Sequence, residues 1–138
     1  MKYSGLMLFA IFSAVALAGC GGSNHDTTRV TGQVTFGGGP CPAQGSVMFL
    51  PLDVPQGKSQ RTGFAPFDTS GHFTVSSFGK GDGLPPGKYR VRIDCWKKPP
   101  MGMEPGVSHV PDGFRPPDVI IEAGKSAVVN IDVPAAAK

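Results

Sequence analysis

The chain has 138 residues, with 13 Lys or Arg, 10 Asp or Glu and a formal net charge of +3. This length suits one domain with a hydrophobic core and is too short for two once a leader is removed. The basic residues are scattered and are not interleaved with aromatic ones, so we expect no nucleic acid among the partners.

The first segment has the pattern of a secretory leader. Lys2 precedes an apolar run from Leu6 to Leu17, and small residues follow it. A charged start, a short apolar segment and small residues before a cut are typical of a signal peptide. Two alternatives are a secreted protein cut at an Ala-x-Ala-like site and an uncleaved membrane helix, although a span needs about 20 apolar residues.

The tetrapeptide Leu17-Ala18-Gly19-Cys20 resembles a bacterial lipobox. The resemblance implies that residues 1–19 are a lipoprotein signal peptide and that Cys20 becomes an acylated, palmitate-type N-terminus. Two or three chains anchor stably, because each buried methylene contributes about 0.8 kcal/mol. Gly21 stands where an Asp would imply inner-membrane retention. We therefore expect the cell envelope, the outer membrane rather than the inner, with the domain facing the periplasm or the exterior.

The rest of the chain has the alternating pattern of short β-strands. Residues 20–28 form a polar tether, residues 29–134 one domain, and residues 135–138 a tail. No stretch keeps a helical period over ten residues, whereas alternation of apolar and polar residues predicts half-buried strands. Seven strands are expected, at residues 29–36, 45–52, 61–67, 72–78, 88–95, 118–122 and 126–133. Such strands predict an all-β fold, an antiparallel two-sheet sandwich.

Turn residues separate these strands. Asp68 to Gly71 and Asp82 to Gly87 each begin with a carboxylate that can accept backbone amides. Residues 97–117 form a long irregular excursion that holds six of the 14 prolines. Binding sites are often found on such long loops of a rigid scaffold.

Cysteine usage suggests a disulfide. Lipidation would use Cys20 and leave Cys41 and Cys95 as an even pair in an oxidising compartment. A bridge closing that loop could contribute about 4 kcal/mol in the chain-entropy model. The alternative is two buried free thiols, which pack as small hydrophobic groups.

Four motifs in a fixed order resemble a known family: Val30–Pro40, Gly45–Pro51, Asp68–Phe73 and Gly81–Val91. They are similar to small planctomycete-type lipoproteins that carry a carboxypeptidase-regulatory-like, transthyretin-type sandwich domain. The resemblance covers residues 29–134. It implies an accessory or adhesion-like fold with no activity of its own.

The residues of the chain offer little for catalysis or metal binding. His25 lies in the tether. His72 faces away from Phe73, so we expect its side chain to be exposed to solvent. His109 has no nucleophile turn beside it. The transthyretin fold also hosts a purine-pathway hydrolase, but the Tyr-Arg-Gly-Ser terminus of that family is missing here. Asp68 and Asp82 stand singly in turns, so we expect neither a metal nor a cofactor.

The leading hypothesis is a non-enzymatic envelope lipoprotein that binds a protein or glycan partner or has a structural role. Its candidate surface is in the excursion and consists of Trp96, Lys97, Lys98, Met101, Met103 and His109. A plain alternative is that the loop folds its Trp and Met side chains back over an open sheet end. A functional alternative is a small hydrolase or transport accessory that uses His109.

Overall fold

The structure is a computed structural model that describes residues 25–53 and 61–135. The expected signal peptide, the lipobox with Cys20, and residues 136–138 of the tail lie outside the described residues. The described chain is all-β. Its eight strands are β1 (Val30–Phe36), β2 (Gly45–Asp53), β3 (Gly63–Phe67), β4 (His72–Thr74), β5 (Gly87–Lys98), β6 (Val107–Ser108), β7 (Val119–Ile121) and β8 (Ala127–Val133).

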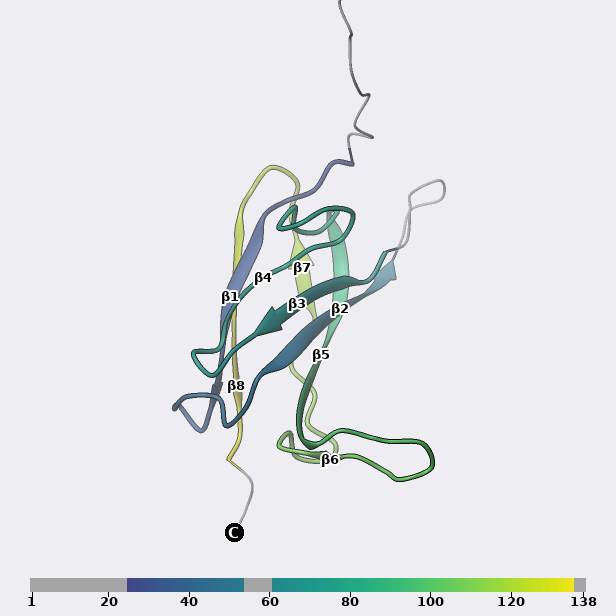
Figure 1. The fold of residues 1–138 in the computed structure, drawn as a ribbon. Helices are drawn as coiled ribbons and strands as arrows, with labels where there is room; N and C mark the ends of the chain where they lie inside the picture. The colour runs from purple at the N-terminus through teal and green to yellow at the C-terminus, as the bar shows by residue number, and fades with distance from the viewer. Residues whose placement is uncertain (1–24, 54–60, 136–138) are drawn as a thin grey trace, which may run out of the picture.

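The strands form two sheets, as the alternation predicted (Figure 1). The smaller sheet has the order β4-β1-β8, and the larger one has the order β3-β2-β5-β6. Strands β6 and β7 pair with opposite ends of the long β5, so β5 joins both of these short strands to the larger sheet. No helix in the described part of the chain is long and apolar enough to cross a membrane.

Both sheets contribute side chains to one core. On β5 the alternate residues Tyr89, Val91, Ile93 and Cys95 are buried and the residues between them are more exposed. From the smaller sheet come buried side chains of Val30, Val34, Phe73, Val129, Ile131 and Val133. Burying one face of each sheet against the other removes apolar surface from water and leaves polar side chains outside.

One pairing differs from the antiparallel arrangement that we expected. Strands β1 and β8, the first and the last, pair in parallel over seven register positions, from Val30 with Ala127 to Phe36 with Val133. The reason is topological. The chain passes from β7 in the larger sheet to β8 in the smaller one, and β8 then runs in the direction of β1. Alternation defines the faces of a strand and not its neighbours.

Strand β4 is shorter than the expected 72–78. The carboxylate of Asp82 accepts hydrogen bonds from the backbone amides of Ser77, Phe78 and Gly79 at 2.8, 3.0 and 2.9 Å. These amides are therefore not available to a strand ladder, and residues 77–83 form a compact loop. Beyond β4 the pairing continues through the Val75 amide, which donates to Val30 O at 2.9 Å, and through an isolated bridge between Ser76 and Phe64 of β3.

The turn between β3 and β4 has the form that its sequence predicted. The Asp68 side chain accepts hydrogen bonds from the amide and hydroxyl of Ser70. Gly71 has φ +77°, and a Cβ there would lie 1.9 Å from the carbonyl oxygen of Val34. Only glycine fits at this position. The turn therefore holds the start of β4 directly against β1, where Val34 N donates to Gly71 O at 2.9 Å.

The expected disulfide between Cys41 and Cys95 is wrong for this structure, in which both are buried free thiols. The two thiols have different acceptors. The Cys41 Sγ–H donates to the carbonyl of Val34 at 3.2 Å, and the Cys95 Sγ–H donates to the carbonyl of Ala43 at 3.6 Å. Each group is thus hydrogen-bonded in place, and the alternative of packed thiols describes them correctly.

The first strand is preceded by residues that already pack on the domain. Thr28, which we assigned to the tether, forms a bridge with Leu84, and its hydroxyl donates to the carbonyl of Glu122 at 3.1 Å. His25 is exposed, and its ring stacks on Phe78 with centroids 3.6 Å apart. The last residues of the expected tether therefore belong to the folded part.

Candidate functional site

Residues 96–109 form a hairpin that projects from the sandwich, and we call this segment the arm (Figure 1). Strand β5 continues to Lys98, and β6 pairs back on it with Trp96 opposite Ser108 and Lys98 opposite Val107. We expected an irregular excursion from residue 97, so this part of the expectation was wrong. Proline has no backbone N–H to donate to a strand ladder. The hairpin can form because its prolines lie at the tip, outside the paired residues.

The tip is a tight turn between Met101 and Glu104. Met101 N donates to Glu104 O at 3.3 Å, and Glu104 N donates to Met101 O at 3.0 Å. Gly102 supplies the positive φ of +56° that such a turn needs. The backbone of the tip is thus closed on itself, and its side chains point outward.

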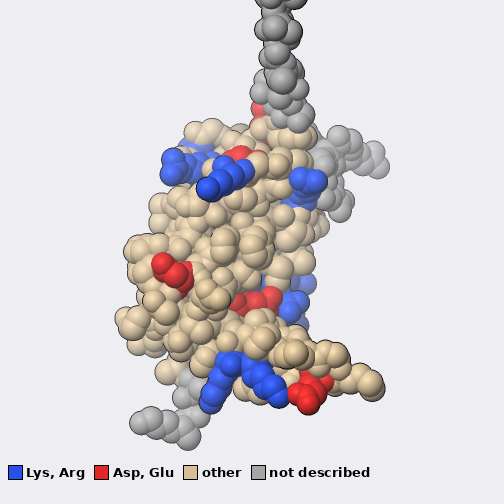
Figure 2. Space-filling model, in the orientation of Figure 1, with Lys and Arg blue, Asp and Glu red and all other residues tan. Residues whose placement is uncertain are grey.

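Two methionines dominate this tip. The Met101 side chain is 69% exposed and Met103 is fully exposed at 103%. Lys97 is also exposed, and Lys98 forms a 2.8 Å ion pair with Glu104. In Figure 2 basic and acidic atoms lie together on the arm at the lower end, next to an uncharged tip. The arm therefore combines an apolar end with a charged stem.

Trp96 has a different role from the methionines. It is half-buried, and a Cβ on Gly106 would lie 2.7 Å from its Cζ3 atom and 2.8 Å from the backbone nitrogen of Pro100. The indole ring therefore packs on bare backbone within the arm. The alternative that the loop folds its Trp and Met side chains back over an open sheet end is not what the structure shows, because Trp96 packs within the arm and Met101 and Met103 are exposed.

The root of the arm is held by one carbonyl. Cys95 O accepts from the backbone amide of His109 at 2.8 Å and from the hydroxyl of Ser108 at 3.2 Å. The Ser108 oxygen also accepts from Val110 N at 3.0 Å. His109 thus takes part in the root through its backbone. Within the described residues its imidazole makes no hydrogen bond to a side chain.

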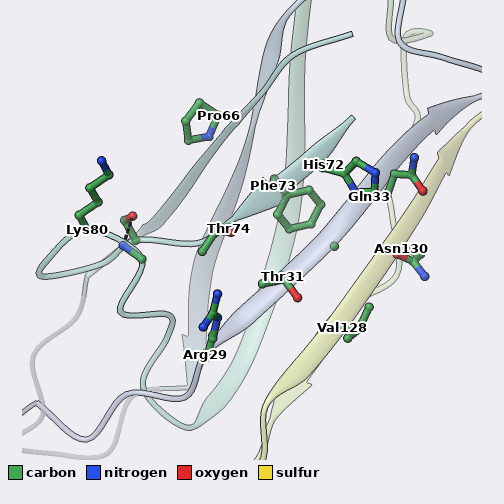
Figure 3. A pocket seen from close by; sticks show the side chains of 13 residues that line it. Arg29, Thr31, Gln33, Pro66, His72, Phe73, Thr74, Lys80, Val128 and Asn130 are labelled. Carbon is green, nitrogen blue, oxygen red and sulfur yellow. Dashed lines mark hydrogen bonds between the residues drawn. The ribbon is translucent and has the colours of Figure 1, made fainter. Parts of the chain in front are cut away.

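The structure also shows a second surface, which sequence reasoning missed. An open groove of about 930 Å³ lies over the outer face of the smaller sheet, β4-β1-β8 (Figure 3). Its polar lining includes Arg29, Thr31, Gln33, His72, Lys80 and Asn130. The sequence pattern indicated only that the polar residues at alternate positions lie on the solvent-exposed face of each strand. What brings them together is the pairing of three strands, which no local pattern reveals.

The fold and these surfaces define an all-β protein of two packed sheets with a projecting arm and a polar groove. Metal-ligating side chains do not cluster in groups of three or more anywhere in residues 25–53 and 61–135. Comparisons with protein-family models, with curated proteins and with solved structures found no match. The function must therefore be argued from the sequence and the geometry of this chain.

Proposed function

We propose that the protein is a non-enzymatic, lipid-anchored binding module of the cell envelope, and that the tip of the arm binds a protein partner. The observation that carries the proposal is the pair Met101 and Met103, exposed at the end of an arm whose root is hydrogen-bonded. Flexible, polarisable methionines adapt to a partner surface. Exposed apolar groups of this kind are typical of interaction sites.

The position of the arm supports this proposal. In Figure 1 residues 25–28 lie at one end of the sandwich and the arm lies at the other. If Cys20 carries the lipid, the arm points away from the anchoring membrane, where a partner has access to it. The resemblance of residues 29–134 to accessory sandwich domains of lipoproteins supports a binding role in the same way.

The anchor is tested by mass spectrometry of protein from the membrane fraction. We expect an acylated peptide that begins at Cys20 and, for Cys20→Ala, an unprocessed precursor. Recovery of unmodified protein trimmed to the same residue from the soluble fraction would contradict the lipid anchor. It would leave the proposal for the arm standing, because the two rest on different residues.

The arm is tested by site-specific photo-crosslinking in cells. A photoreactive amino acid replaces Met103, and in a matched control it replaces Ile120 of β7, which is 70% exposed. We expect one discrete protein adduct from position 103, reduced by Met101→Ser, and none from position 120. The same adducts from both positions, or no effect of Met101→Ser, would show that the arm is not the binding surface.

A further inference from the structure

The groove on the smaller sheet is a surface separate from the arm, and its chemistry differs. Its side chains come from the outer faces of β4, β1 and β8 and from the segments that lead into them (Figure 3). Register places these side chains in two rows across the sheet. One row is Thr74, Thr31 and Val128, and the next is His72, Gln33 and Asn130.

Neighbouring strands lie about 4.8 Å apart, so each row presents three side chains at regular spacing. The rows are mostly polar groups that both donate and accept hydrogen bonds. Within the described residues, the side chains of Thr31, Thr74, His72 and Asn130 form no hydrogen bond to another residue, and Gln33 donates only to the carbonyl of Ser70 at 3.1 Å. These groups are therefore free to bind a ligand.

Two cations stand at the end of the groove beside the threonine row. Arg29 lines the groove directly before β1, two residues ahead of Thr31, and its carbonyl accepts from Ala127 N at 2.9 Å. Lys80 is placed by its neighbour Gly81, whose amide donates to the Ser76 hydroxyl at 2.8 Å. In Figure 3 the threonines lie between these cations and the row of His72, Gln33 and Asn130.

The charge of the groove has one sign. No residue with a carboxylate lines it, and neither Arg29 nor Lys80 has an ion-pair partner in residues 25–53 and 61–135. Five other cations, Lys88, Arg90, Arg92, Lys98 and Lys125, are paired with Asp or Glu. Arg61, Lys97 and Arg115 are likewise without an ion pair in the described residues, but they lie outside the groove. Two unpaired cations above neutral hydrogen-bonding groups complement a negatively charged ligand.

From these observations we infer that the groove binds an acidic polysaccharide, a chain of sugar rings that carry carboxylates. Sugar hydroxyls both donate and accept hydrogen bonds, as do the amide, imidazole and hydroxyl side chains of the two rows. The carboxylates of the sugar chain can form ion pairs with Arg29 and Lys80. The volume is within the range of about 300–1,000 Å³ of small-ligand sites, and the open form admits a chain. An acidic peptide fits less well, because its backbone pairs best with a sheet edge and not with a face.

The test is titration of the chain as purified from cells with an oligogalacturonate, monitored by calorimetry. Three comparison ligands are a neutral malto-oligosaccharide of equal length, a poly-glutamate of equal charge and the oligogalacturonate in high salt. We expect measurable binding of the oligogalacturonate, at least about tenfold weaker binding of both other ligands, and weaker binding as salt screens the charges.

Two variants locate the site. The double variant Arg29→Gln and Lys80→Gln should weaken binding about tenfold or more, and Asn130→Ala should weaken it several-fold. The matched control is Arg115→Gln with Lys125→Gln, which removes the same charge at exposed positions outside the groove. It should bind as the unaltered chain does. Circular dichroism and thermal unfolding check that each variant is folded.

Several results would overturn the inference. These are no binding of the oligogalacturonate, equal binding of poly-glutamate, an equal loss in the control pair, or no effect of Asn130→Ala. The arm serves as an internal comparison, because Met103→Ser should leave this binding unchanged. A failure at the groove therefore leaves the proposed protein-binding function of the arm untouched.

Discussion

Tyr89 donates its hydroxyl hydrogen to the carbonyl oxygen of Pro85, four residues earlier, at 2.8 Å. The ring is buried in the core near the start of β5, so this bond ties the preceding turn to the sandwich. A buried tyrosine that reaches back to an upstream carbonyl braces a corner of a β-sandwich.

The first prediction concerns this bond. Tyr89→Phe should lower the free energy of unfolding by about 1 kcal/mol, because the ring stays and only the hydroxyl donor is lost. Tyr89→Leu, which also removes ring contacts, should cost more, about 2 kcal/mol or above. Urea denaturation measures both. Equal stability of the unaltered chain and Tyr89→Phe would show that the bond contributes nothing.

The same residue gives a pH prediction. Burial raises the pKa of Tyr89 above its ordinary value of 10.0. Because the folded pKa exceeds the unfolded one, stability is fully present below about pH 10 and falls as the pH rises through the folded pKa. The only other tyrosine of the chain is Tyr3, in the expected signal peptide, so ultraviolet titration of protein that begins at Cys20 reports Tyr89 alone. A midpoint at or below 10 would contradict the prediction.

The free thiols are checked by alkylation. Burial, with smaller effects from Cys95 and Asp68, raises the pKa of Cys41 from 9.0 to about 11. At pH 8 the folded protein should thus react about a hundredfold more slowly at Cys41 than an exposed thiol. In denaturant without reductant, Cys41 and Cys95 should both label completely. Incomplete labelling that reductant restores would instead indicate a disulfide.

The loop after β4 should be sensitive to acid. Burial would raise the pKa of Asp82, but hydrogen bonds from the backbone amides of Ser77, Gly79 and Phe78 outweigh it and lower the pKa. A lowered folded pKa gives stability that is present above about pH 4 and lost as the pH falls through the folded value. Asp82→Asn should remove that acid dependence and destabilise by about 1 kcal/mol at neutral pH. An unchanged acid unfolding profile would contradict this role.

The arm can be loosened without touching its tip. Gly106→Ala places a methyl group against Trp96 and the backbone of Pro100, so the indole ring must move. Because the chain has one Trp, its fluorescence should shift towards that of an exposed indole. Met103→Ser, the control, should leave the spectrum as it is. An unshifted spectrum for Gly106→Ala would mean that Trp96 does not pack on this glycine.

Comparison with the sequence-based expectations shows which features are local. Strand β1 ends at Phe36 as predicted and begins at Val30, one residue after the expected start at Arg29, and the alternation on β5 places Tyr89 and Cys95 on the buried face as expected. The Asp68 to Gly71 turn also forms. Each of these depends on residues close in the chain, because the side-chain period of a strand and the φ angle of a glycine are local properties.

The candidate sites were less predictable. Composition and proline content indicated the residues of the arm as a candidate surface. The sequence did not show that Trp96 packs against the arm while Met103 is exposed, because this difference depends on the hairpin and on Gly106. The groove was not predicted at all. Arg29, His72 and Asn130 are far apart in sequence, and they face one surface only because β1 pairs with both β4 and β8.

By itself, the sequence therefore determined that the domain is all-β, which residues of β1, β5 and β8 face inward, and where the turn from Asp68 to Gly71 falls. The tertiary structure alone decided the parallel pairing of β1 with β8, the separate acceptors that leave Cys41 and Cys95 as thiols, and the assembly of the groove. The physical reason is that alternation states which side of a strand is apolar, whereas strand neighbours are chosen by packing and hydrogen bonding over the whole chain.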